Sequence, residues 1–465
     1  MPLAHGGGSS GVLLAHGVGS SSDLPLPLDL VLQAGAATVV LSFLIAAVLW
    51  TRPRLGGGTI RPVRTAGWLP ALRIAVLLLS AYLVGNALLG PRNSANPAAH
   101  ALFVWLWVGL VPLSVLFGPV WRAVNPLRTL ARLLRFPRAG LRPGPGAAAW
   151  PGVLWLLAFV WFELVAPDRT DPLVIGCCLL GYAVAQLGMA LLRGEEWFAR
   201  GDCFELYSEL AGRLSPLRWR VPLSGLAVPL PFAGGLAAFV AVWWGSTVFD
   251  SASGSPVWAG FTQRAGHASL YASGALVLVC AGVLIAVRKI AGKLDVTASL
   301  VPIAVGYTLA HYLSLLVVEA PRGVVLLVQQ WGVAPGAAWN VVPIPAVIAV
   351  AQVALILVGH VLGVIVAHDA AITAAASPVG GPPLAAALPP ATASRPAGPL
   401  PVAGLPLAAA SAPVAVSGLV VGGDSAGVAV AVPGRSTLAT LAGELPLVLF
   451  MIGCTWAGLF LLFVR

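Results

Sequence analysis

The stretch Ala268–Val287 reads ASLYASGALVLVCAGVLIAV, and Arg288 and Lys289 follow it directly. The stretch carries no charge, and about 20 apolar residues are what an α-helix needs to cross the hydrocarbon core of a bilayer. Basic residues directly after such a stretch are typical of its cytoplasmic end. The segment therefore predicts a transmembrane helix that ends on the inner side.

Similar apolar stretches recur along the whole chain. The predicted spans are residues 29–50, 69–89, 100–120, 148–166, 173–192, 231–249, 268–287, 296–318, 343–366 and 446–464. A further apolar stretch, 324–333, is too short to cross and predicts an interfacial or re-entrant piece. Only helices and closed barrels satisfy their backbone groups within lipid. The predicted fold class is all-α, a polytopic transmembrane helix bundle of about ten spans.

Composition supports this class. Of the 465 residues, 58% are hydrophobic and 9% are charged, and the mean hydropathy is +0.92. A soluble domain carries about 25% charged residues, so an ordinary soluble enzyme is excluded. The abundance of Leu, Val and Ile excludes disorder for most of the length. The five cysteines show no CxxC spacing, which supports neither a disulfide framework nor a thiolate zinc site.

The basic residues indicate an orientation. Of the 26 Lys and Arg residues, 21 fall in or next to odd-numbered loops and five on the opposite side. Because cytoplasmic loops are rich in Lys and Arg, odd loops are predicted inside and the N-terminus outside. Arg-rich, Ala-rich and Gly-rich usage favours a bacterial source, hence the bacterial cytoplasmic membrane. The net charge of +10 then reflects topology, so the lipid bilayer is the predicted partner and nucleic acid is not.

The chain divides into four predicted parts. Residues 1–28 form an extracytoplasmic N-terminal segment without a complete secretory signal, and residues 29–372 form a transmembrane domain of about nine spans. Residues 373–440 are a low-complexity linker rich in Ala, Pro, Gly and Val. Residues 441–465 hold a C-terminal transmembrane helix. No chemistry is predicted for the linker.

Two loops predict short helices. Asn125-Pro126 suits the cap and first position of a helix with leucines on one side and arginines on the other, which predicts an interfacial helix on anionic lipid. The run Asp202-Cys203-Phe204-Glu205 resembles a capping box and predicts a helix through Ala211. That helix is predicted to be a connector lying on the membrane, with a docking surface as the alternative.

Polar groups within a bilayer are costly and mark candidate catalytic residues. His311 and Tyr307 are four residues apart in the predicted span 296–318, on one helix face, and Glu319 follows its end. Glu163 follows the aromatic run 159–162, where burial suits a general acid or base. The candidate catalytic residues are therefore His311, Tyr307, Glu163 and Glu319, and packing with hydrogen bonding is the alternative for each.

A divalent metal is a possible cofactor. The candidate ligands are His311, His360, His368 and Asp369. In regular helices His311 lies in the outer half and His360 in the inner half, roughly 15 Å apart in depth. We therefore do not expect all four residues at one ion.

The predicted outer face offers another set of carboxylates and imidazoles, the groups that hold a metal able to activate water. No HExxH-like motif links them. The set comprises His16, Asp23, Asp29, His100, Glu163, Asp168, Asp171, Asp250, His267, His311 and Glu319.

Several motifs resemble those of one family of bacterial membrane proteins. They are Ala15-His16-Gly17 and residues 23–27, 51–54, 118–130, 204–208, 213–216, 306–312 and 359–369. In these motifs the chain resembles the fenitrothion hydrolases, an organophosphorus hydrolase-like membrane family. The resemblance implies hydrolysis of an aryl phosphorothioate triester, a small-molecule substrate, to a nitrophenol and a dialkyl thiophosphate. It implies no particular catalytic residues.

Two non-enzymatic alternatives stay open. One is a transporter, or a metal-handling or assembly protein that uses the intramembrane histidines. The other is a structural partner in a larger membrane complex. Transporters often contain inverted repeats, and the sequence shows no convincing repeat, which mildly disfavours the transporter.

Overall fold

A computed structural model describes residues 24, 27–56, 59–61, 67–141, 148–229, 234–291, 296–376 and 437–463. Most of the predicted N-terminal segment, with His16 and Asp23, lies outside the described residues. So does most of the predicted linker 373–440.

The described chain is all-helical, apart from two isolated bridges that pair Ile60 with Trp219 and Ala148 with Gly234. Its helices are α1 (Leu28–Leu49), α2 (Leu69–Leu89), the π-helix η2 (His100–Val108), α3 (Leu110–Phe117), α4 (Val120–Val124), α5 (Pro126–Leu133), α6 (Trp150–Leu164), α7 (Pro172–Arg193), α8 (Trp197–Gly201), α9 (Cys203–Gly212), α10 (Ser224–Ala227), α11 (Leu236–Ser253), α12 (Pro256–Arg264), α13 (Ala268–Ala291), α14 (Thr297–His311), α15 (Leu313–Gln330), α16 (Pro345–Ala376) and α17 (Thr437–Phe463).

Within these residues, eight helical segments are long and apolar enough to cross a membrane. Such lengths of uninterrupted apolar helix satisfy the backbone internally and suit a lipid surrounding. The protein is thus a multi-pass membrane protein by length and composition. The eight segments are Leu28–Leu49, Leu69–Leu89, His100–Phe117, Pro172–Arg193, Ala268–Lys289, Leu313–Gln330, Pro345–Ala375 and Leu445–Phe463.

Three of the ten predicted spans are not among the eight. The ranges 148–166 and 296–318 correspond mainly to α6 and α14, which have 15 residues each. The range 231–249 corresponds to α11, whose side chains are buried along most of its length. Helix α14 and most of α11 are buried within the bundle, whereas α6 also exposes Leu154 and Trp161.

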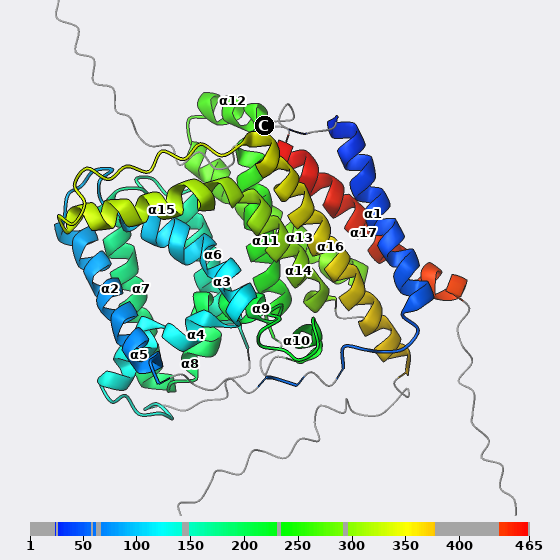
Figure 1. Ribbon diagram of the computed structural model, residues 1–465, viewed down its shortest axis with the longest axis horizontal. Coiled ribbons are helices and arrows are strands. Elements are labelled where there is room, and N and C mark those ends of the chain that lie inside the picture. Colours follow the sequence, from blue (N-terminus) through cyan, green and yellow to red (C-terminus); the bar gives the residue numbers. More distant parts are fainter. Residues whose placement is uncertain are drawn as a thin grey trace, which may run out of the picture.

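The structure also changes the short piece predicted at 324–333. Helix α14 ends at His311, and α15 continues from Leu313 to Gln330 as one of the eight candidate segments. Figure 1 shows α15 running across the view, whereas α2 and α7 run down it. The predicted single span 296–318 is therefore two helices that meet at Tyr312.

Close backbone packing joins α14 to α16. A Cβ atom at Gly306 would lie 2.6 Å from the Leu355 carbonyl oxygen, and one at Gly359 would lie 2.7 Å from that of Pro302. Gly359 and Gly363 are four residues apart, the spacing of small residues that lets transmembrane helices approach closely. This contact fixes the position of α14, and with it that of His311.

The last helix completes the same side of the bundle. Helix α17 packs against α1 and α16, and the two helices α1 and α17 lie side by side at one edge of Figure 1. A Cβ atom at Gly458 of α17 would lie 3.2 Å from the ring of Tyr307. The C-terminal helix therefore reaches the interior of the bundle.

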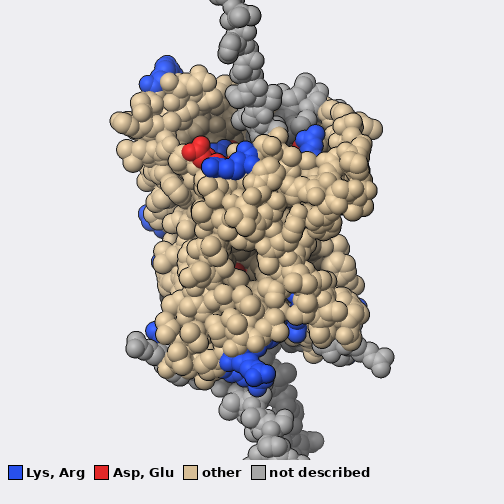
Figure 2. Space-filling view, turned by 90° about the vertical axis from the view of Figure 1, so that its left-hand side faces the viewer, with Lys and Arg blue, Asp and Glu red and all other residues tan. Residues whose placement is uncertain are grey.

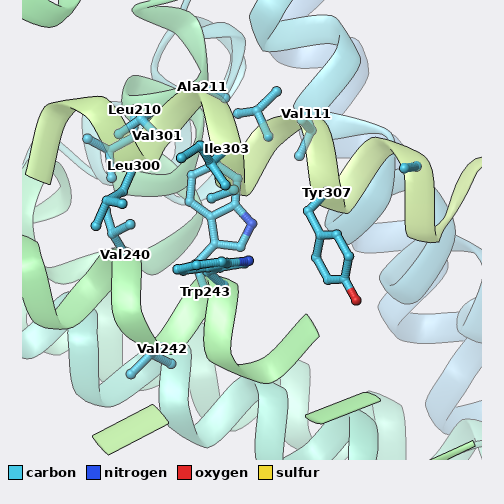
Figure 3. Close-up of a cluster of buried hydrophobic side chains, with 14 of the residues drawn as sticks. Val111, Leu210, Ala211, Val240, Val242, Trp243, Leu300, Val301, Ile303 and Tyr307 are labelled. Atoms are coloured by element: carbon cyan, nitrogen blue, oxygen red, sulfur yellow. The ribbon is translucent and has the colours of Figure 1, made fainter. Parts of the chain in front are cut away.

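The centre of the bundle is apolar around Trp243. Figure 3 shows Trp243 among aliphatic side chains that include Val240, Leu300 and Ile303, with the hydroxyl of Tyr307 pointing away from them. The indole N–H of Trp243 donates to Thr308 Oγ1 at 3.0 Å, which satisfies it within the core. On the face in Figure 2, most visible charged side chains lie toward the two ends and few lie between them.

Candidate functional site

A buried carboxylate, imidazole and hydroxyl meet where α11 and α14 end. His311 Nε2 lies 2.8 Å from Asp250 Oδ2, and His311 Nδ1 lies 3.0 Å from Ser251 Oγ. The exposed fractions of the three residues are 0% for His311, 1% for Ser251 and 6% for Asp250. We call these three residues the outer triad, after the predicted orientation.

The position of the outer triad follows from helix geometry. Asp250 and Ser251 are consecutive on α11, so their side chains project about 100° apart around the helix. One can therefore contact each nitrogen of an imidazole that enters from α14. His311 is the last residue of α14, the helix that the glycine contact holds against α16.

Two tyrosines complete the arrangement. The Tyr312 hydroxyl donates to Asp250 Oδ2 at 2.9 Å, and Tyr307 Oη lies 2.8 Å from Ser251 Oγ. The ring of Tyr312 meets that of His311 edge-on, with ring centres 4.5 Å apart. The structure thus joins two predicted catalytic residues, Tyr307 and His311, through Ser251.

This arrangement can support proton transfer and nucleophilic attack. If Nε2–H of His311 donates to Asp250, then Nδ1 can accept the Ser251 proton, which Ser251 otherwise donates to the Thr247 carbonyl at 3.0 Å. An imidazole between a carboxylate and a hydroxyl is the general arrangement that activates a serine. In the serine proteases the carboxylate bonds Nδ1 and the serine faces Nε2, so the two nitrogens are exchanged here.

Glu163 lies near the outer triad without a direct hydrogen bond to it. It is the penultimate residue of α6 and is 4% exposed. Its charge interacts with those of Asp250 and Arg169. Its Oε2 atom has no hydrogen-bond partner within the described part of the chain.

Glu319, the fourth predicted catalytic residue, belongs to a different cluster. Its Oε2 lies 3.0 Å from His100 Nε2, and its Oε1 accepts from Arg322 at 2.8 Å. The nearby indole N–H of Trp105 donates to the Ala320 carbonyl at 2.9 Å. These contacts anchor α15 to η2, a structural role.

The predicted metal ligands are dispersed. His360 Nδ1 lies 2.8 Å from the carbonyl oxygen of Ile356 in its own helix, and His368 Nε2 lies 3.1 Å from that of Trp50. Asp369 Oδ1 accepts the Trp50 indole N–H at 2.8 Å. These contacts tie the end of α16 to the segment after α1.

No three His, Cys, Asp or Glu residues converge in a way that could hold a metal ion, as far as the described ranges extend. His311, His360, His368 and Asp369 therefore do not form one site. Within the described part of the chain, no group of residues fits the divalent metal that the sequence left open as a cofactor.

A second buried polar network lies around the caps of α5 and α9. Asn125 caps α5 by accepting from the backbone N–H of Leu127 and Arg128, and Asp202 caps α9 in the same way. Asn125 Nδ2 donates to Asp202 Oδ2 at 2.7 Å, which joins the two caps. We call this the inner network.

Charged side chains extend the inner network. Arg128 donates to Glu205 Oε1 at 2.6 Å and to Glu195 Oε1 at 2.9 Å, and both Arg128 and Glu205 are buried. Burial raises the pKa of Glu205 above its ordinary value of 4.5, and the charge of Arg128 opposes that rise. Burial acts the same way on Glu195, but hydrogen bonds from Arg132 and Arg128 outweigh it and hold its pKa below 4.5.

Three predictions about these short helices are wrong. Helix α9 was expected to lie on the membrane or to present a docking surface, yet nine of its ten residues are buried. Its Glu205 does not complete a capping box, because it pairs with Arg128 and the Asp202 N–H donates to Phe198. Arg128 is buried rather than facing the lipid headgroups.

The sequence interpretation placed Asp250 in the outer set but missed Ser251 and Tyr312. The available signal was polar residues at the end of an otherwise apolar stretch, Phe249-Asp250-Ser251. Serine is common in helices that cross membranes, so only the approach of His311 distinguishes Ser251.

Comparison of the chain with models of known families, with curated proteins and with solved structures yields no match.

Proposed function

We propose that the protein is a membrane-embedded hydrolase of an apolar organophosphorus ester, the activity that its resemblance to fenitrothion hydrolases implies. One observation carries the proposal: His311 lies between the Asp250 carboxylate and the Ser251 hydroxyl, at 2.8 Å and 3.0 Å. A base bonded to a hydroxyl and oriented by a carboxylate is the general signature of an activated nucleophile. Because an aryl phosphorothioate triester is uncharged, it would dissolve in the lipid and reach the outer triad from there.

The proposed reaction has two steps. His311 Nδ1 takes the Ser251 proton while Ser251 Oγ forms a bond to phosphorus and the phosphorus–aryloxy bond breaks. The aryl oxide leaves, and protonated His311 returns its proton to it. A water molecule, deprotonated by His311, then attacks phosphorus, and the bond between phosphorus and Ser251 Oγ breaks. Protonated His311 returns the proton to Ser251 Oγ as the dialkyl thiophosphate leaves. Asp250 stabilises the imidazolium in both steps.

The proposal includes a location and topology. The protein would cross the bacterial cytoplasmic membrane ten times with its N-terminus outside, as the split of 21 basic residues against five supports. In that orientation α11 and α14 end at the outer side. The outer triad and Glu163 would then lie in the outer half of the bilayer.

Kinetics of nitrophenol release from fenitrothion by the full chain in detergent test the activity. Ser251→Ala and His311→Asn should each lower kcat by roughly 10³-fold or more. Ser246→Ala is the matched control, because Ser246 is equally buried on α11 and bonds only the Trp243 carbonyl. Turnover that survives both triad substitutions, or is lost in Ser246→Ala, contradicts the proposal.

Burial of the outer triad favours one alternative, a proton-linked transporter. Buried acids and imidazoles within a membrane protein often form proton relays. In that case the purified protein would release no nitrophenol, and vesicles containing it would acidify with solute uptake. Loss of that acidification in His311→Asn would support the transporter.

A further inference from the structure

Glu163 is a buried carboxylate that the proposed reaction does not use. Its Oε2 makes no hydrogen bond within the described residues, and only 4% of the residue is exposed. An unpaired carboxylate costs several kcal/mol to bury, so such groups are rare without a partner. The buried carboxylate of Glu163 is therefore expected to bind a ligand.

A second unpartnered oxygen lies nearby on another helix. The Tyr207 hydroxyl of α9 is buried and has no hydrogen-bond partner among the described residues. It is close enough to Glu163 for the two groups to interact electrostatically. The Tyr207 ring stacks on Trp107 with centres 4.7 Å apart and meets Trp243 at 4.5 Å. These contacts hold the ring in place.

Charged and phenolic groups from several other parts of the chain lie around Glu163. Asp250 of α11 and Tyr312 at the start of α15 interact with its charge, as does Tyr207. Arg169, which follows α6, supplies a favourable positive charge. The carboxylates of Glu163 and Asp250 repel each other. The hydrogen bond of Asp250 to His311 does not reach Glu163.

We propose that Glu163, Asp250, Tyr207 and Tyr312 bind a monovalent cation. Carboxylate and phenol oxygens are hard ligands that suit such an ion, and one positive charge offsets the repulsion of two buried acids. The cation is Na⁺, K⁺ or a hydrated proton, which share this chemistry. The site touches the outer triad through Asp250, but its existence does not depend on hydrolysis.

Thermal unfolding of the full chain in detergent tests the site. NaCl and KCl are titrated against choline chloride at constant ionic strength, and a separate series lowers the pH in choline chloride. A bound cation should raise Tm saturably, by about 3 °C at 100 times its Kd. A rise with Na⁺ or K⁺ identifies a metal cation. Acid also raises Tm through Asp202 and Glu205, whose pKa values burial raises, so only the part of an acid-induced rise that Glu163→Gln removes identifies the proton.

Variants connect that shift to the site. Glu163→Gln should abolish it, and Tyr207→Phe should weaken it at least fivefold in apparent affinity while keeping the ring packing. Glu319→Gln is the matched control, because Glu319 already bonds His100 and Arg322. Ser251→Ala should also keep the shift, which separates this site from the hydrolase.

Two results would overturn the proposal. One is a wild-type Tm that responds to neither Na⁺ nor K⁺ beyond choline chloride, together with an acid response that is the same in Glu163→Gln. The other is a shift of equal size and affinity in wild type and Tyr207→Phe, together with its persistence in Glu163→Gln. If Glu163→Gln does not fold, the affinity in Tyr207→Phe decides alone.

Discussion

The outer triad and the inner network are both buried polar clusters, yet they are built differently. In the inner network, Asp202 Oδ1 accepts from Tyr182 and Oδ2 accepts from Asn125, and Glu205 is bonded by Arg128. Near the outer triad, Glu163 keeps an oxygen that has no partner among the described residues. The inner network joins helix caps, whereas the outer triad joins an acid, a base and a hydroxyl.

This difference separates stability from chemistry. A fully bonded network favours one arrangement of its helices, so its loss should destabilise the protein. An imidazole shared by an acid and a hydroxyl can accept and return a proton, so its loss should mainly affect a reaction. The following substitutions test that division, beginning with the largest expected change in stability.

Arg128→Met should cause the largest loss. It leaves Glu205 buried without its main partner, which typically costs roughly 3–5 kcal/mol. Unfolding by denaturant in detergent measures the loss. Arg132→Met is the control, because Arg132 is 43% exposed and should change stability by less than about 1 kcal/mol. Equal losses in the two variants would show that burial of Arg128 is not what matters.

Asn125→Ala should cost about 2 kcal/mol. The substitution removes the cap of α5 and leaves Asp202 with one fewer donor. The same unfolding experiment measures it. Asn125→Asp keeps the capping oxygen but repels Asp202, so stability no lower than wild type would refute the link between the two caps.

Asp202→Asn should change how stability depends on pH. Burial raises the pKa of Asp202 above its ordinary value of 3.8, although hydrogen bonds from Tyr182 and Trp121 oppose that rise. The folded state therefore holds this proton more tightly than the unfolded state, so the wild-type contribution falls as pH rises from about 4 through the folded pKa.

The variant lacks that fall. The difference in Tm between wild type and Asp202→Asn should therefore shrink or reverse as pH rises from 4 to 7, on top of a constant cost from lost hydrogen bonds. A difference that stays the same across this range, or that grows, contradicts the raised pKa.

Ser251→Ala should have the smallest effect on stability, about 1 kcal/mol. It removes one hydroxyl from the contacts of His311 and Tyr307 without creating a large cavity. Its unfolding midpoint should stay close to that of Ser246→Ala. A loss as large as that of Arg128→Met would assign the outer triad a structural role instead.

The sequence predicted the fold class well because apolar length is a local property. The stretch 268–287 alone indicates a spanning helix, and the caps Asn125 and Asp202 are confirmed because they involve residues two or three positions away. It did not predict where α14 ends, because the contact of Gly306 with α16 and the turn at Tyr312 depend on tertiary packing.

The candidate site was only partly predictable for the same reason. Tyr307 and His311 share a helix face, which the sequence shows, but Ser251 lies 60 residues from His311 along the chain. Arg128 was expected at the lipid surface because amphipathic spacing does not show that Glu205 and Glu195 face it. Pairings between distant segments require the structure.

Labelling with an aryl fluorophosphonate tests the central claim most directly, because the probe forms a stable bond only with an activated serine. Intact-mass and peptide analysis should find one adduct, on Ser251, in wild type and Ser246→Ala. Ser251→Ala and His311→Asn should show none. A folded wild-type protein that takes up no label, or that is labelled equally when Ser251 is absent, would contradict the account.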